Sequence, residues 1–183
     1  MTAHAASGAW PQDFEVADMR ATLLDDGDPA LFAALFGDPA TMQGVGPALD
    51  RHAATRAFSA ARRQMQADPP AARYWCLDAG VPARGLLSLV PDADGRAAET
   101  GVLLPPALQA RGVATAVLGH LCDVVLGTGA LDALWTRHRA GHAAAAGLMR
   151  RLGFEARPPE NGWQHWRLER DAWRRLVGHP ARA

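Results

Sequence analysis

One short stretch of the sequence has the residue types to bind an anion. Gln109–Ala114 (QARGVA) lies between an apolar run ending in Pro105 and Pro106 and a segment with helical periodicity. A helix that begins at about Gly112 leaves its first backbone amides without intrahelical acceptors, and its dipole favours negative charge there. Small residues at 110, 112 and 114 leave room for a pyrophosphate, and Arg111 could add a charge. The stretch predicts an anion-binding helix N-terminus; the alternative is a simple glycine turn.

A second candidate for chemistry is Glu99, ten residues before this stretch. It is flanked by two alanines and by Thr100 and Gly101 in a segment that is otherwise apolar. Because a buried carboxylate without a partner is costly, a functional role is one interpretation. The other interpretation is a solvated glutamate on a strand.

Changes in hydrophobic period predict the elements that position these residues. The pattern alternates between a period of two and a period near 3.6, which indicates a mixed α/β sheet. Asp28 and Pro29 mark a helix start, and Gly127 with Gly129 ends another. We expect strands at 14–24, 73–78, 84–90, 98–104, 131–137 and 163–170, with one more around 154–157, and helices at 29–37, 52–67, 112–126 and 143–154.

Length and composition limit the possible classes of protein. At 183 residues and 49% hydrophobic, the chain predicts one domain at 13–176 between flexible ends at 1–12 and 177–183. A net charge of zero argues against nucleic acid or an anionic membrane as partner. Cys76 and Cys122 are too few for a disulfide framework. With no signal peptide and no long apolar run, we expect a soluble, cytoplasmic protein.

Longer stretches around these residues resemble a known family. ETGVLLPPALQARGVATAVLGHL (99–121), followed by HAAAAGLMRRLGF (142–154), is similar to the GNAT N-acetyltransferase superfamily, and to its branch typified by ribosomal-protein-alanine acetyltransferases. The family signature Q/R-x-x-G-x-G/A, which holds the pyrophosphate of acetyl-coenzyme A (acetyl-CoA), is matched by Gln109, Gly112 and Ala114. LLDDGDPALFAALFGDPATM (23–42) also matches. The resemblance covers about residues 14–175.

The resemblance implies a fold and a set of site residues. The fold would be a single α/β domain whose mixed, mostly antiparallel sheet has six to seven strands and about four helices. The sheet would be splayed between its fourth and fifth strands, 98–104 and 131–137, with a bulge-like distortion where the pantetheine arm inserts. Glu99 would be the catalytic base. The implied donor-binding residues are Val102, Leu103, Leu104, Gln109, Ala110, Arg111, Gly112, Val113, Ala114, Thr115 and His142.

Several positions depart from the family pattern. His142 and Ala145 stand where the branch usually has asparagine and serine, so His142 either seats the coenzyme arm or only caps the helix. Met149 stands where many members have a general-acid tyrosine. Without that acid, the thiol would leave as the anion or take its proton from water. The two histidines of TRHRAGH (136–142) are separated by a glycine-containing loop and not by a helical turn, and no carboxylate or cysteine accompanies them, so we expect no metal.

The predicted function is acetyl transfer from acetyl-CoA to an amine by direct attack, without a covalent enzyme intermediate. The alternatives are transfer of another acyl group and a CoA-binding regulator without turnover. The acceptor stays open, as small molecule or protein N-terminus, and we expect a monomer or homodimer. Arg137 and Arg139 have two interpretations. They contact an acidic acceptor or the coenzyme phosphates, or they are solvated arginines at the end of a strand. The resemblance implies that 42–50 and 157–163 select the acceptor.

Overall fold

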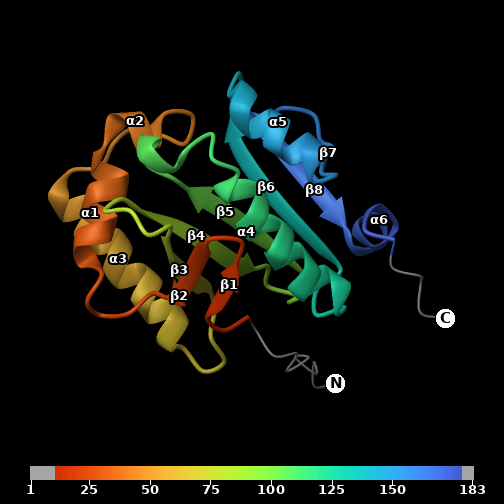
Figure 1. Ribbon diagram of the computed structural model, residues 1–183, viewed down its shortest axis with the longest axis horizontal. Helices are drawn as coiled ribbons and strands as arrows, with labels where there is room; N and C mark the ends of the chain where they lie inside the picture. The colour runs from red at the N-terminus through yellow and green to blue at the C-terminus, as the bar shows by residue number, and fades with distance from the viewer. Residues whose placement is uncertain (1–10, 179–183) are drawn as a thin grey trace.

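The computed structural model describes residues 11–178, and the predicted flexible ends lie largely outside them (Figure 1). Its centre is one sheet of eight strands in the order β1-β2-β3-β4-β5-β6-β8-β7. All neighbouring strands are antiparallel except β5 and β6, which are parallel. The strands are β1 (Phe14–Val16), β2 (Met19–Leu23), β3 (Arg73–Asp78), β4 (Arg84–Pro91), β5 (Ala97–Leu103), β6 (Ala133–Arg139), β7 (Glu155–Ala156) and β8 (Trp163–Glu169).

Within residues 11–178, six α-helices connect and cover these strands. A 3₁₀ turn at Pro106–Leu108 precedes α4, and a π-helical turn at Asp123–Gly127 follows it. The helices are α1 (Pro29–Gly37), α2 (Pro39–Met42), α3 (Arg51–Gln66), α4 (Val113–Cys122), α5 (Ala143–Arg151) and α6 (Arg170–Leu176).

The predicted α/β class and mixed sheet are confirmed, but the strand and helix counts are too low. The segment predicted as one strand at 14–24 is a hairpin, because Ala17 takes a left-handed φ of 49° and turns the chain. The apolar alternation changes phase at Ala17 and Asp18, from even-numbered to odd-numbered positions, but no glycine or proline marks the turn. The short helix α2 and the final helix α6 were also missed; α6 begins at Arg170, which the prediction placed in the last strand.

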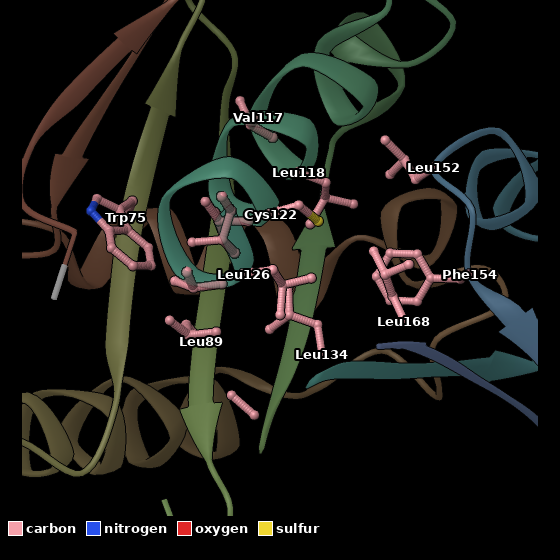
Figure 2. Close-up of a cluster of buried hydrophobic side chains, with 14 of the residues drawn as sticks. Trp75, Leu89, Val117, Leu118, Cys122, Leu126, Leu134, Leu152, Phe154 and Leu168 are labelled. Carbon is pink, nitrogen blue, oxygen red and sulfur yellow. The ribbon is translucent and has the colours of Figure 1, made fainter. Parts of the chain in front are cut away.

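The larger core lies between α4 and one face of the sheet (Figure 2). Val117 and Leu121 of α4 are fully buried, as are Leu89 of β4 and Leu134 of β6. Full burial of such a side chain contributes about 1.5–3 kcal/mol. This packing fixes the axis of α4, and therefore the position of its N-terminus, relative to β5 and β6.

A second core covers the opposite face over only part of the sheet. Phe32 of α1 and Phe58 of α3 pack there against Leu86 and Leu103 of β4 and β5. Neither β6 nor β8 contributes to this cluster among the described residues. Helices α1 and α3 therefore leave the same face of β6 and β8 without a helical cover.

Candidate functional site

The sheet opens between β5 and β6. These strands pair through only three residues each, Ala97–Glu99 with Ala133–Trp135. Beyond that, β5 runs on to Leu103 and β6 to Arg139 without pairing to each other, and Figure 1 shows the two strands separating. The predicted splay is therefore confirmed, and the edge of β5 from Thr100 onward has no neighbouring strand. Glu99 lies where the strands part.

The predicted bulge in this region is wrong for β5. Its ladder to β4 keeps one register from Ala98–Pro91 to Leu103–Leu86, so no extra residue is inserted. The parting needs no bulge, because β6 turns away while β5 stays paired to β4. Strand β5 ends at Leu103, two residues before Pro105.

Helix α4 begins beside this opening without a side-chain cap. Gly112 is its N-cap residue, with a left-handed φ of 78° and ψ of −6°, so the helix starts one residue later than predicted. The first helical hydrogen bond runs from the Ala116 amide to the Gly112 carbonyl, at 3.0 Å. The amides of Val113, Ala114 and Thr115 thus have no acceptor within the helix. This arrangement is suited to binding an anion.

The other predicted donor-binding residues are placed around this terminus in different ways. Leu103, Leu104 and Val113 are buried in the cores, so their side chains pack the interior. The Gln109 side-chain amide donates to the Leu104 carbonyl at 2.9 Å, which holds the loop between β5 and α4. Ala110 takes a left-handed φ of 56°.

Two arginines add positive charge near the first turn of α4. Arg111 immediately precedes the N-cap residue and is exposed. Arg151, from the last turn of α5, donates to the Thr115 hydroxyl at 3.2 Å. Sequence reasoning missed Arg151, because 36 residues separate it from Thr115 and nothing local indicates the contact.

Glu99 is partly buried and forms an ion pair. Its Oε1 lies 3.3 Å from Arg137 Nε of β6, and its side chain is 33% exposed. Because Trp135 is the residue opposite Glu99, and Ala98 and Leu134 belong to the α4-side core, the Glu99 carboxylate lies on the other face of the sheet.

Burial raises the pKa of the Glu99 carboxyl above its ordinary value, and the nearby Arg137 guanidinium opposes this rise. The carboxylate is thus a better proton acceptor than an exposed one while remaining paired. It is not the freely solvated strand glutamate that the sequence left open. Sequence reasoning considered Arg137 only for an external anion and missed its pairing with Glu99.

His142 caps α5, which confirms one of its two predicted roles. Its Nδ1 accepts the Ala145 amide at 3.3 Å. The imidazole also lies against the loop before α3: a Cβ built on Gly44 would come within 1.9 Å of His142 Cδ2. The Gly44 carbonyl accepts the Arg139 amide at 2.8 Å. The loop at 42–50 therefore meets the open end of β6.

His138, another histidine of the 136–142 segment, has structural partners. His138 is buried, and its Nε2 accepts the Trp166 indole N–H at 2.9 Å, while its Nδ1 lies 2.9 Å from the Arg139 carbonyl. Between residues 11 and 178, no three His, Cys, Asp or Glu side chains gather as a possible metal site.

Neither a thiol nor Met149 offers acid or nucleophilic chemistry here. Met149 is buried in the α4-side core. Cys76 and Cys122 are buried free thiols, and burial raises the pKa of both. A hollow of about 330 Å³ is lined by Asp13, Phe14, Glu15, Arg20 and Thr22 on β1 and β2. It lies three to four strand spacings, or about 14–19 Å, from β5 and is not part of this site.

A sheet that opens between two parallel strands beside an uncapped helix N-terminus is the arrangement that the resemblance to the GNAT superfamily implies. The chain belongs to the GNAT acetyltransferase family, because the model of the acetyltransferase (GNAT) domain matches residues 19–155. A comparison with curated proteins finds no match. Within residues 11–178, no helix has the length and apolar character to cross a bilayer.

Solved structures share the fold at low identity. RimL, a ribosomal L7/L12 alpha-N-protein acetyltransferase in complex with CoA, is 18% identical with a TM-score of 0.73, covering 88% of this chain and 99% of that one. Spermidine N-acetyltransferase from Vibrio cholerae, in complex with CoA and spermine, is 15% identical with a TM-score of 0.69, covering 85% and 98%. The microcin C7 self immunity acetyltransferase MccE, in complex with acetyl-CoA and AMP, is 13% identical with a TM-score of 0.71, covering 89% and 99%.

Proposed function

We propose that the protein transfers the acetyl group of acetyl-CoA to the primary amine of a small molecule or a protein N-terminus by direct attack on the thioester. One observation carries the proposal. The unpaired edge of β5 leads, within ten residues of Leu103, to the uncapped amides at the start of α4. The first feature suits an extended chain of amides, and the second suits a diphosphate.

The residues of this region fit the donor. The backbone at Val102–Leu104 would pair with the pantetheine amides as a missing strand would. The amides from Arg111 to Thr115 would hold the pyrophosphate, with the guanidinium groups of Arg111 and Arg151 adding charge. Contact of His142 with the coenzyme arm stays a prediction, as do the cytoplasmic location and the monomeric or dimeric state.

Glu99 would act as the general base. It accepts the proton that the amine loses as its nitrogen bonds to the acetyl carbon, either directly or through one water. The sulfur then leaves with its bonding electrons, and this departure needs no protein acid because a thiol has a pKa near 8.5. The buried state of Met149 and of both cysteines supports direct transfer without an acyl-enzyme.

Donor binding is tested first, by thermal unfolding with equal concentrations of acetyl-, succinyl- and fatty-acyl-CoA. A ligand at 100 times its Kd stabilises the fold by about 2.7 kcal/mol, so the preferred donor gives the largest shift. A larger shift in the unfolding temperature with another acyl-CoA would mean that this acyl group, and not acetyl, is the one transferred. No shift with any of them would refute it.

Turnover is tested by CoA release across a panel of amines. We expect Glu99→Gln to lower kcat by about 10²- to 10⁴-fold, the usual contribution of a general base. Glu15→Gln is the matched control, because Glu15 is an exposed strand glutamate paired with Arg20 on β1 and β2. CoA binding without thiol release from any amine would favour the regulator without turnover.

A further inference from the structure

The face of β6 and β8 that α1 and α3 leave uncovered carries an unusual set of side chains. Residues opposite one another on β6 and β8 share a face, and their sequence neighbours Leu134, Trp166 and Leu168 fill the α4-side core. We call this uncovered surface the β6–β8 face, which consists of Trp135, Arg137, Arg139, Trp163, His165 and Arg167.

The charges of the β6–β8 face are only partly balanced. Arg137 pairs with Glu99 at 3.3 Å, and Arg167 pairs with Glu169 at 2.6 Å. Arg139 is exposed and forms no ion pair with any carboxylate of residues 11–178. The positive charge of Arg139 therefore has no carboxylate partner within the described residues.

Arg139 is nevertheless held in place. Its guanidinium lies 4.2 Å from the centre of the Trp163 ring, and that of Arg137 lies 5.5 Å from the same centre. A guanidinium resting on an aromatic face keeps its N–H groups free at the edges, where they match the two oxygens of a carboxylate or phosphate. Trp163 thus reduces the entropy that Arg139 would lose on binding an anion.

The position of Arg139 relates it to the amine acceptor. It lies four residues along β6 from Trp135, the partner of Glu99, which is about 13 Å along the strand. Its amide donates to Gly44, and the next amide, of Ala140, donates to Gly162 at 2.9 Å. Arg139 therefore lies between the two loops, 42–50 and 157–163, that the family resemblance assigns to the acceptor.

An acidic cluster elsewhere in the chain, Asp25, Asp26 and Asp28, lies just before α1. Asp26 pairs with Arg62 of α3, and Asp28 pairs with Arg84 of β4. These carboxylates are neutralised by their own partners on the α1–α3 side. Two of the three carboxylates of this cluster are therefore already paired with cations and are less available to attract a polyamine.

We propose that Arg139, supported by Trp163, binds an anionic group of the acceptor, so that the preferred substrates are amines that also carry a carboxylate or a phosphate. This inference rests on the proposed acetyl transfer and deepens it. Glu99 takes the proton from the amine at the opening, while Arg139 holds the negative group further along β6. Neutral amines and polyamines lack the group that pairs with Arg139.

The test compares pairs of acceptors in which one member carries an anionic group and the other does not. The peptide amides Ala-Glu-NH₂ and Ala-Gln-NH₂ are one pair, phosphoethanolamine and ethanolamine are a second, and spermidine is the cationic probe. We expect kcat/KM to be about 10- to 100-fold higher for the anionic member of at least one pair, the usual effect of a charge-assisted pair. The pair that shows it tells whether the anion is a carboxylate or a phosphate.

Variants assign the preference to Arg139. Arg139→Gln should abolish it, and Arg139→Lys should retain part of it, because an ammonium keeps the charge but not the two-pronged geometry. Arg63→Gln removes the same charge from an exposed position near the end of α3 and should leave the preference unchanged. Equal kcat/KM within both pairs, or a preference that survives Arg139→Gln, would overturn the inference while the acetyltransferase activity stands.

Calorimetric titration of the CoA-free protein with these acceptors measures their binding directly, so it tests the anion site even if no turnover is found. Tighter binding of Ala-Glu-NH₂ or phosphoethanolamine than of its neutral partner, lost in Arg139→Gln, would support the anion site although the proposed function had failed. Absence of any such difference would refute the anion site independently.

Discussion

Replacing Gly44 by alanine tests how the loop before α3 is docked on α5. Gly44 has a left-handed φ of 79°, which costs an L-residue about 1–2 kcal/mol. The new Cβ would also lie 1.9 Å from His142 Cδ2, so the imidazole must move, and such overpacking costs about 1–3 kcal/mol. Together these effects predict a loss of about 2–5 kcal/mol in the free energy of unfolding.

A double-mutant cycle separates the two costs. In a His142→Ala background the clash is absent, so Gly44→Ala should cost only the backbone strain of about 1–2 kcal/mol. The coupling between the two positions is then about 1–3 kcal/mol, with the double variant more stable than the sum predicts. Gly80→Ala is the matched control, because Gly80 has a φ of 68° and no heavy atom within 4 Å of its added Cβ.

The assay is urea unfolding of the four proteins of the cycle and the control, with the free energies obtained by linear extrapolation. If Gly44→Ala and His142→Ala are additive within about 0.5 kcal/mol, the loop does not contact the start of α5 as described. The same holds if Gly44→Ala costs no more than Gly80→Ala. Either result would also count against the position of the 42–50 loop beside Arg139, because the contacts of Gly44 with His142 and with the Arg139 amide depend on the same docked loop.

Three further predictions follow from single residues. Arg137→Gln removes the cation that opposes the rise in the pKa of Glu99, so this pKa should rise further. The acid limb of the pH profile of kcat/KM, measured with one acceptor, should therefore move to higher pH. An acid limb that stays in place or moves to lower pH contradicts the pairing. Ala110→Gly should raise the free energy of unfolding by about 0.5 kcal/mol, because relief of the left-handed backbone strain outweighs the greater conformational entropy of glycine in the unfolded chain. A lower free energy of unfolding, measured with urea, would refute this prediction. Cys76 and Cys122 should react with a thiol reagent only as the protein unfolds; rapid labelling of the native protein would show that they are not buried.

Parts of the site could be predicted from the sequence because they depend on neighbouring residues. A glycine before a helical pattern predicted the uncapped start of α4, and the structure moves that start by one residue. The capping role of His142 follows from its place before a run of alanines. The hairpin at Ala17 was not predicted, because its signals in the sequence are only a turn-favouring Asp18 and a phase change in the alternation, with no glycine or proline.

The sequence by itself determined the α/β class, the family signature at Gln109–Ala114 and the position of Glu99 in a strand, because hydrophobic period and helix starts are local properties. Only the tertiary structure decided which groups meet. Arg137 reaches Glu99, Arg151 reaches Thr115, and Gly44 meets His142 across intervals of 36 to 98 residues. Those contacts join residues that lie far apart in the sequence, so they depend on how whole strands and helices pack against one another, which no local pattern encodes.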